Sequence, residues 1–246
     1  RQYYILEDFP KALEAFEYAI LVDETFIGAH LEKAKTLEEL NRFEEAISYY
    51  QMTMELDTPT PFAYLRIGKC YEKLGKTSAA LEYYTKTVNE DPLLDKGWLA
   101  LTDIYLSQNK PEKALQNIKK AIGIDEDIPD YWNKMGEIYV KLNQLEAAAG
   151  SFQKSLSLQS DSIEVHLALA DVLIISKDPK ESLQVLKEAQ LIFNDDAGIL
   201  YRLAGTYYLL NKLNKSMNYL TEALALNFEG HVILEELFPA LLKEKA

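Results

Sequence analysis

The sequence predicts an all-α fold built from a repeated pair of antiparallel helices, and three observations lead to this prediction. The segments around Trp98 and Trp132 align without a gap, so the spacing between the two tryptophans defines a repeat period of 34 residues. When the repeats are aligned, some repeat positions always carry small side chains and others always carry large ones. The large side chains recur at the spacing of one face of a helix, twice in each unit. Stepping by this period in both directions gives complete repeats at 27–60, 61–94, 95–128, 129–162, 163–196 and 197–230.

The small columns indicate where helices approach one another closely. Position 8 of the repeat reads Ala34, Gly68, Thr102, Gly136, Ala170 and Ala204. Position 20 reads Ala46, Ala80, Ala114, Ala148, Ser182 and Ser216. Position 24 is large and reads Tyr50, Tyr84, Ile118, Phe152, Leu186 and Leu220. We expect the large side chains of one hairpin to fill the space left by the small residues of its neighbour.

The turn between the two helices of each repeat is marked by one column. Position 15 reads Asn41, Gly75, Asn109, Asn143, Lys177 and Asn211. Glycine and asparagine tolerate the left-handed backbone conformation that closes a helix. The column therefore predicts where the first helix of each repeat, helix A, ends and the second helix, helix B, follows.

The same frame extends to both ends of the chain, which we predict to be a single domain over residues 1–246. Residues 1–26 fit a partial leading repeat, because Tyr3 and Phe16 lie one period before Leu37 and Tyr50. Residues 231–246 fit a C-terminal capping helix. We expect Pro239 to kink or end that helix near Phe238, because proline removes a helix hydrogen bond. Since Arg1 already falls inside a helical pattern, we interpret the chain as a piece of a longer protein.

These columns resemble the tetratricopeptide repeat, whose 34-residue pattern is met best by residues 61–94 and 129–162. The sequence departs from that pattern at Lys33, which occupies an otherwise apolar position, and only Pro92 matches its terminal proline. The resemblance implies a right-handed α-α superhelix, a solenoid of antiparallel helix hairpins, with helix A lining a concave groove.

By the same resemblance, the chain is expected to be a protein-interaction scaffold that binds a peptide or helical segment of a partner in this groove. The residues that we expect to line it are Lys35, Phe62, Leu65, Arg66, Lys69, Leu99, Asp103, Leu106, Asn133, Glu137, Leu167, Asp171, Ile174, Tyr201 and Tyr208. The Lys and Asn pattern of a chaperone carboxylate clamp is absent from these columns. Alternatively, the module positions a catalytic, membrane or signalling domain outside residues 1–246, and self-association is a further possibility.

Charge divides the expected groove along the chain. Asp103, Glu137 and Asp171 occupy position 9 of successive repeats and predict an acidic band that suits basic residues in a partner. The alternative is that these acids form a solvent-exposed helix face and have no role in binding. The apolar groove residues have an alternative as well, because they can contact the neighbouring repeat instead of a partner.

The composition argues against other classes of function. The net charge of −13 repels nucleic acid, and no apolar run is long enough for membrane insertion. The three histidines are too far apart for a zinc site, and no Gly-rich loop indicates a cofactor, so we expect neither metal nor cofactor. Cys70 is the only cysteine, which fits a cytoplasmic location and a packing role rather than catalysis. We therefore predict that the chain is not an enzyme.

Overall fold

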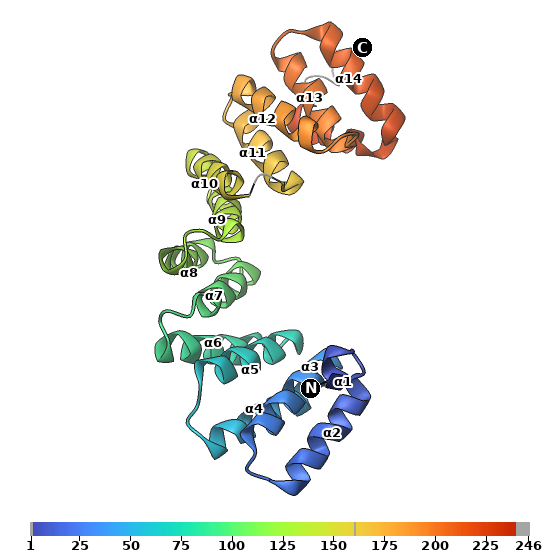
Figure 1. Ribbon diagram of the computed structural model, residues 1–246. Coiled ribbons are helices and arrows are strands. Elements are labelled where there is room, and N and C mark those ends of the chain that lie inside the picture. Colours follow the sequence, from blue (N-terminus) through green and yellow to red (C-terminus); the bar gives the residue numbers. More distant parts are fainter. Residues whose placement is uncertain (1, 160, 240–246) are drawn as a thin grey trace. The chain divides into compact units, whose positions relative to one another are not determined.

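The computed structural model describes residues 2–159 and 161–239, and within these ranges it contains α-helices and one 3-10 helix but no strand. The chain divides into two compact units, residues 1–124 (unit 1) and residues 125–246 (unit 2), and each is described by itself. In both units consecutive helices lie side by side as antiparallel hairpins (Figure 1). The predicted all-α solenoid of helix hairpins is confirmed.

Unit 1 contains four helix pairs in chain order. They are α1 (Gln2–Ile5) and α2 (Phe9–Val22), α3 (Ile27–Glu39) and α4 (Phe43–Leu56), α5 (Pro61–Lys73) and α6 (Thr77–Glu90), and α7 (Asp95–Ser107) and α8 (Pro111–Ile124). Helices α3, α5 and α7 are the A helices, and each packs on the second helix of the preceding pair.

Unit 2 contains three pairs followed by a short C-terminal segment. They are α9 (Pro129–Lys141) and α10 (Leu145–Leu158), α11 (Ile163–Ile175) and α12 (Pro179–Ile192), and α13 (Ala197–Leu209) and α14 (Leu213–Leu226). The 3-10 helix η1 (Phe228–His231) and α15 (Val232–Leu237) follow. The A helices of the complete repeats start exactly one repeat period apart along the whole series.

The turn column behaves as predicted in all complete repeats. Asn41 has φ of 57° and Gly75 has φ of 70°, and the other residues of the column share this left-handed conformation. Beyond α3, the carbonyl of Leu37 accepts a hydrogen bond from the Arg42 amide at 2.8 Å, and that of Glu38 accepts one from Asn41 at 2.9 Å. These bonds satisfy carbonyls at the helix end that have no partner inside the helix.

The small residues at position 8 make room for a side chain of their own hairpin and not of the neighbouring one. A Cβ atom on Gly68 would lie 2.5 Å from the ring of Tyr84, and one on Gly136 would lie 2.5 Å from the ring of Phe152. Each ring is the position 24 side chain of the same hairpin. The large side chain therefore fills the space beside its own helix A, and the expectation that it fills the neighbouring hairpin was wrong.

Position 4 ties helix A to the loop before it. The indole nitrogens of Trp98 and Trp132 each donate a hydrogen bond of 2.8 Å to a carbonyl six residues upstream, on Pro92 and Glu126. His30 has the same contact with the carbonyl of Glu24 at 2.8 Å. These half-buried or buried rings anchor the loops between repeats by a specific bond in addition to packing.

Lys33, which departs from the repeat pattern, is buried in unit 1. Its ammonium donates to Glu17 Oε1 at 2.8 Å and to the Tyr49 hydroxyl at 2.7 Å, and so joins α2, α3 and α4. Burial lowers the pKa of this ammonium, but the hydrogen bonds and the charges of Glu17 and Tyr49 together outweigh burial and leave the pKa above its ordinary value. A satisfied ion pair replaces the apolar side chain that other repeats place there.

Residues 228–239 do not continue the hairpin series. Within unit 2, α11 packs on α10 and α13 packs on α12, whereas α15 packs on α13 and reaches α11. Helix α15 ends at Leu237, and Pro239 follows one residue after Phe238, close to the predicted end. The remainder of the expected capping helix, residues 240–246, lies outside the described residues.

Candidate protein-binding groove

The A helices carry most of the predicted groove residues, and the structure places them in three groups. The first group is exposed or half-buried: Lys35, Phe62, Arg66, Lys69, Leu99, Asp103, Leu106, Asn133, Glu137, Leu167, Asp171 and Tyr208. The second is Leu65, which is buried within unit 1. The third is Ile174 and Tyr201, which are buried within unit 2 beneath the C-terminal segment.

Leu65 belongs to the core rather than to the groove. Its side chain is in one apolar cluster with Tyr84 of α6 and with Ala100 and Ile104 of α7. The prediction that Leu65 lines an open surface was therefore wrong. The physical reason is the one left open by the sequence, namely that this column can contact the following repeat.

In unit 1 the aromatic ring of Phe62 on α5 is exposed beside two cations. Phe62 is 42% exposed, which is high for a phenylalanine in a helix. The Lys35 ammonium lies 5.5 Å from the centre of its ring, and the Arg66 guanidinium carbon lies 6.0 Å from it. Both distances allow cation-π attraction, so α3 and α5 together present an aromatic ring framed by positive charge.

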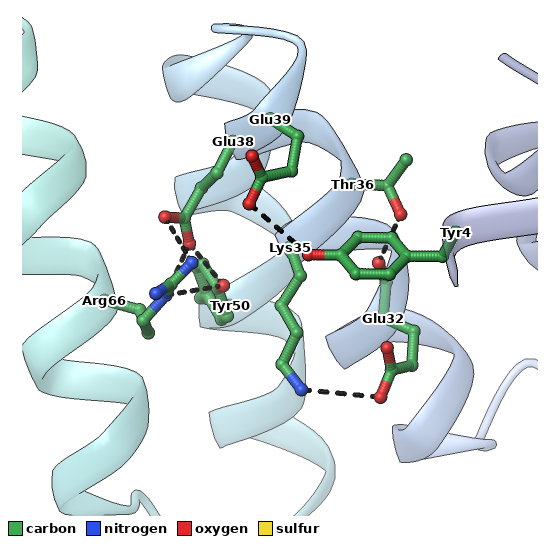
Figure 2. Close-up of polar contacts among 8 residues, drawn as sticks. All are labelled: Tyr4, Glu32, Lys35, Thr36, Glu38, Glu39, Tyr50 and Arg66. Carbon is green, nitrogen blue, oxygen red and sulfur yellow. Dashed lines mark hydrogen bonds and ion pairs between the residues drawn. The ribbon is translucent and has the colours of Figure 1, made fainter. Parts of the chain in front are cut away.

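Arg66 of α5 is held in place by polar residues on α3 and α4 (Figure 2). Its guanidinium contacts both oxygens of Glu38, at 2.8 and 2.7 Å, and the Tyr50 hydroxyl donates to the same carboxylate. Burial and the Glu38 carboxylate raise the pKa of the Tyr50 hydroxyl, so it stays protonated as a donor. The bidentate pair fixes the side of α5 that carries Phe62.

Two further contacts in Figure 2 involve the same face of α3. The Lys35 ammonium pairs with Glu32 Oε1 at 3.4 Å, and the Tyr4 hydroxyl of α1 donates to Glu39 at 3.3 Å. The partial leading repeat thus contacts helix A of the first complete repeat.

Lys69 lies one turn beyond Arg66 on α5 and is exposed. Burial of part of its side chain, followed by the positive charges of Arg66 and Lys96, lowers the pKa of its ammonium. Burial is the main cause of this shift, and the neighbouring cations Arg66 and Lys96 add to it. A carboxylate brought by a partner would relieve this repulsion.

Glu38 and Tyr50 were missed at the level of sequence, although the repeat frame contained a signal. Glutamate occupies position 12 only in the repeats that have tyrosine at position 24. The second such pair behaves in the same way, because the Tyr84 hydroxyl donates to Glu72 Oε2 at 2.6 Å. Positions 12 and 24, considered together, therefore contain a signal for the hydrogen bond between the tyrosine hydroxyl and the glutamate.

In unit 2 the expected acidic band is reduced by an ion pair. Asp171 of α11 accepts from Arg202 of α13, with Nε at 2.6 Å and Nη2 at 2.7 Å. This bidentate contact joins consecutive A helices and compensates the charge of Asp171. Glu137 of α9 remains exposed and accepts from Asn133 at 3.5 Å.

The titratable groups show no arrangement suited to metal binding or thiol chemistry in the described part of the chain. No group of three or more His, Cys, Asp or Glu side chains is found there that could hold a metal ion. Burial, with the Glu38 charge, raises the pKa of the Cys70 thiol to about 12, so the reactive thiolate is scarce at neutral pH. Among helices in the described ranges, none combines the length and apolar character needed to cross a membrane.

Models of one family match the chain over most of its length. Those described as "Tetratricopeptide repeat" match residues 3–61, 62–93, 129–162 and 197–229, and one described as "TPR repeat" matches residues 103–143. The chain belongs to the tetratricopeptide repeat family. Among curated proteins, no sequence matches it.

Solved structures show the same fold at low sequence identity. The C-terminal part of a TPR repeat-containing protein from Cytophaga hutchinsonii has a TM-score of 0.80 at 17% identity, covering 96% of each chain. YrrB, described as a TPR protein with an unusual peptide-binding site, has a TM-score of 0.68 at 17% identity, covering 76% of this chain and 96% of its own. MamA has a TM-score of 0.62 at 17% identity, covering 66% and 95%.

Proposed function

We propose that this chain is a non-enzymatic protein-interaction scaffold that binds a peptide or helical segment of a partner protein on the concave face of its A helices. The observation that carries this proposal is the exposed Phe62 ring between Lys35 and Arg66. Burying this ring against a partner would gain apolar contact without moving the residues that hold Arg66. Membership of the family and the likeness to YrrB, a TPR protein described as having an unusual peptide-binding site, support the same function.

The partner segment that suits unit 1 carries an apolar or aromatic side chain and an acid. The apolar side chain would pack on Phe62, with half-buried Leu99 and Leu106 on the next A helix. The acid would pair with the exposed Lys69 ammonium, which lies one turn from Arg66 on α5. In this unit we therefore propose an acidic partner segment. For the acids at position 9 we retain the weaker hypothesis that they select basic residues elsewhere in the groove.

A selection from a random peptide library tests this proposal. Peptides selected on the wild-type chain should bind the Phe62→Ala and Lys69→Ala variants at least tenfold more weakly, as measured by fluorescence anisotropy. Leu93→Ala is the matched control, because Leu93 is 75% exposed in the loop between α6 and α7. Selected peptides that bind both groove variants as tightly as the wild type would contradict the proposal.

A further inference from the structure

Residues 228–239 cover the concave face of α11 and α13 with apolar side chains. Leu234 and Phe238 are 1% and 2% exposed, and they cluster with Ile174 of α11 and with Leu200 and Tyr201 of α13. Ile174 and Tyr201 occupy the columns that we predicted to face a partner. The segment therefore occupies the place that the proposed function assigns to a bound peptide.

The fit at Phe238 depends on the absence of a side chain at position 9 of the last repeat. A Cβ atom on Gly205 would lie 2.3 Å from the Phe238 ring, so the ring rests directly on the α13 backbone. Every other complete repeat has a lysine or an acid at this position. Gly205 therefore provides a pocket for an aromatic ring that the other A helices lack.

The approach of the segment is fixed by polar and steric contacts as well. The Tyr201 hydroxyl donates to the carbonyl of Asn227 at 2.6 Å, and a Cβ atom on Gly230 would lie 2.7 Å from the Tyr201 ring. Gly230 thus lets η1 pass close to the floor of the pocket. It belongs to the segment and not to the pocket, which allows the two sides to be varied separately.

We propose that Ile174, Tyr201 and Gly205 form a binding pocket for a partner helix with leucine and phenylalanine four residues apart, and that residues 228–239 occupy this pocket in competition with the partner. The spacing follows from Leu234 and Phe238, which lie one turn apart on one face of the segment. Glu235 and Glu236 of the same segment are exposed, so the partner helix is amphipathic with a polar outer face. This proposal rests on the proposed function and extends it to unit 2.

A labelled synthetic peptide with the sequence of residues 227–239 tests the competition. The double variant Leu234→Ser, Phe238→Ser removes the apolar anchors of the segment and leaves the pocket intact. It should bind the peptide at least tenfold more tightly than the wild-type chain does, by fluorescence anisotropy. Adding Gly205→Leu to this double variant should abolish binding, because the leucine side chain fills the pocket. Gly230→Val, which displaces the segment by another route, should also increase peptide binding relative to the wild type.

The controls separate this proposal from a loss of folding and from the proposed function. Val232→Ser alters an exposed residue of the segment and should bind the peptide as weakly as the wild type does. Helical circular dichroism must match for all variants compared. Equal peptide binding by the wild type and the double variant, or binding that survives Gly205→Leu, would overturn the proposal. Neither result affects the Phe62 test in unit 1, so the two proposals can fail separately.

Discussion

The A-helix faces of the two units are built from the same repeat columns but differ in the contacts that hold them in place. In unit 1 the face around α3 and α5 carries cations beside the exposed Phe62 ring, and the pair of Glu38 and Arg66 joins consecutive A helices. In unit 2 the face of α11 and α13 is apolar at Ile174 and Tyr201, and residues 228–239 cover it. The ion pair of Asp171 and Arg202 joins these two A helices beside the covered area.

This difference shows that the same repeat position can present chemically different surfaces in different repeats. Position 9 presents an exposed cation at Lys69 in unit 1, whereas in unit 2 it presents the bare backbone of Gly205. Position 12 provides a half-buried hydrogen-bond acceptor at Glu38 and an apolar contact at Ile174. The binding properties of a groove therefore depend on pairs of columns and on what the flanking segments cover.

The largest effect that we expect comes from removing the cation that compensates Glu38. Arg66→Met should lower the free energy of unfolding by about 3 kcal/mol, because it leaves a nearly buried carboxylate without its ion-pair partner. The matched change in unit 2, Arg202→Met, should cost about half as much, since Asp171 is more exposed to water than Glu38. Urea unfolding at pH 7 measures both values. Equal losses of unfolding free energy in the two variants would contradict the expectation that the exposure of the carboxylate determines the cost.

A second pair of substitutions distinguishes a ring fixed in a core from a ring in a terminal segment. Gly136→Val should lower the free energy of unfolding by about 2 kcal/mol, because Phe152 is fully buried and has no space to move.

Gly205→Val meets the Phe238 ring at a similar distance but should cost less than about 1 kcal/mol, because residues 228–239 can undock. Release of the segment recovers backbone entropy that offsets most of the lost apolar contact. Thermal unfolding gives the two stabilities, and hydrogen exchange of the α15 amides shows the release. A larger loss for Gly205→Val than for Gly136→Val would contradict the assignment of Phe238 to a displaceable segment.

The sequence was sufficient to predict the hairpins because their signals are local. Helix starts, the small columns and the left-handed turns depend on residues within one repeat, and the repeat frame presents each signal again in every unit. The role of position 8 was misjudged because spacing alone does not tell whether a small residue accommodates its own hairpin or the next one. The contact between Gly68 and Tyr84 settles this point.

The groove was less predictable because its exposed residues depend on contacts between repeats. Leu65 is buried by α7, and Asp171 is compensated by an arginine in the following repeat. Neither contact has a periodic signal, because each involves a particular pair of residues. The burial of Tyr201 depends on residues outside the repeats, whose path after Asn227 the repeat frame does not determine.

The smallest effect that we expect concerns the turn column, which the two units share. Lys177 has φ of 63°, a conformation that costs a lysine about 1 kcal/mol relative to glycine because its Cβ approaches the backbone. Lys177→Gly should therefore raise the free energy of unfolding of the chain by up to about 1 kcal/mol, although glycine also gains flexibility in the unfolded state.

The control is Asn143→Gly in the equivalent turn of unit 2, where asparagine already tolerates φ of 56°. That change should alter stability by only a few tenths of a kcal/mol, as measured by urea unfolding under the same conditions. Because neither residue lies on the concave face, binding of the peptide of residues 227–239 should remain unchanged in both variants. A stabilised chain with altered peptide binding would mean that turn geometry, and not the groove side chains alone, controls the pocket of unit 2.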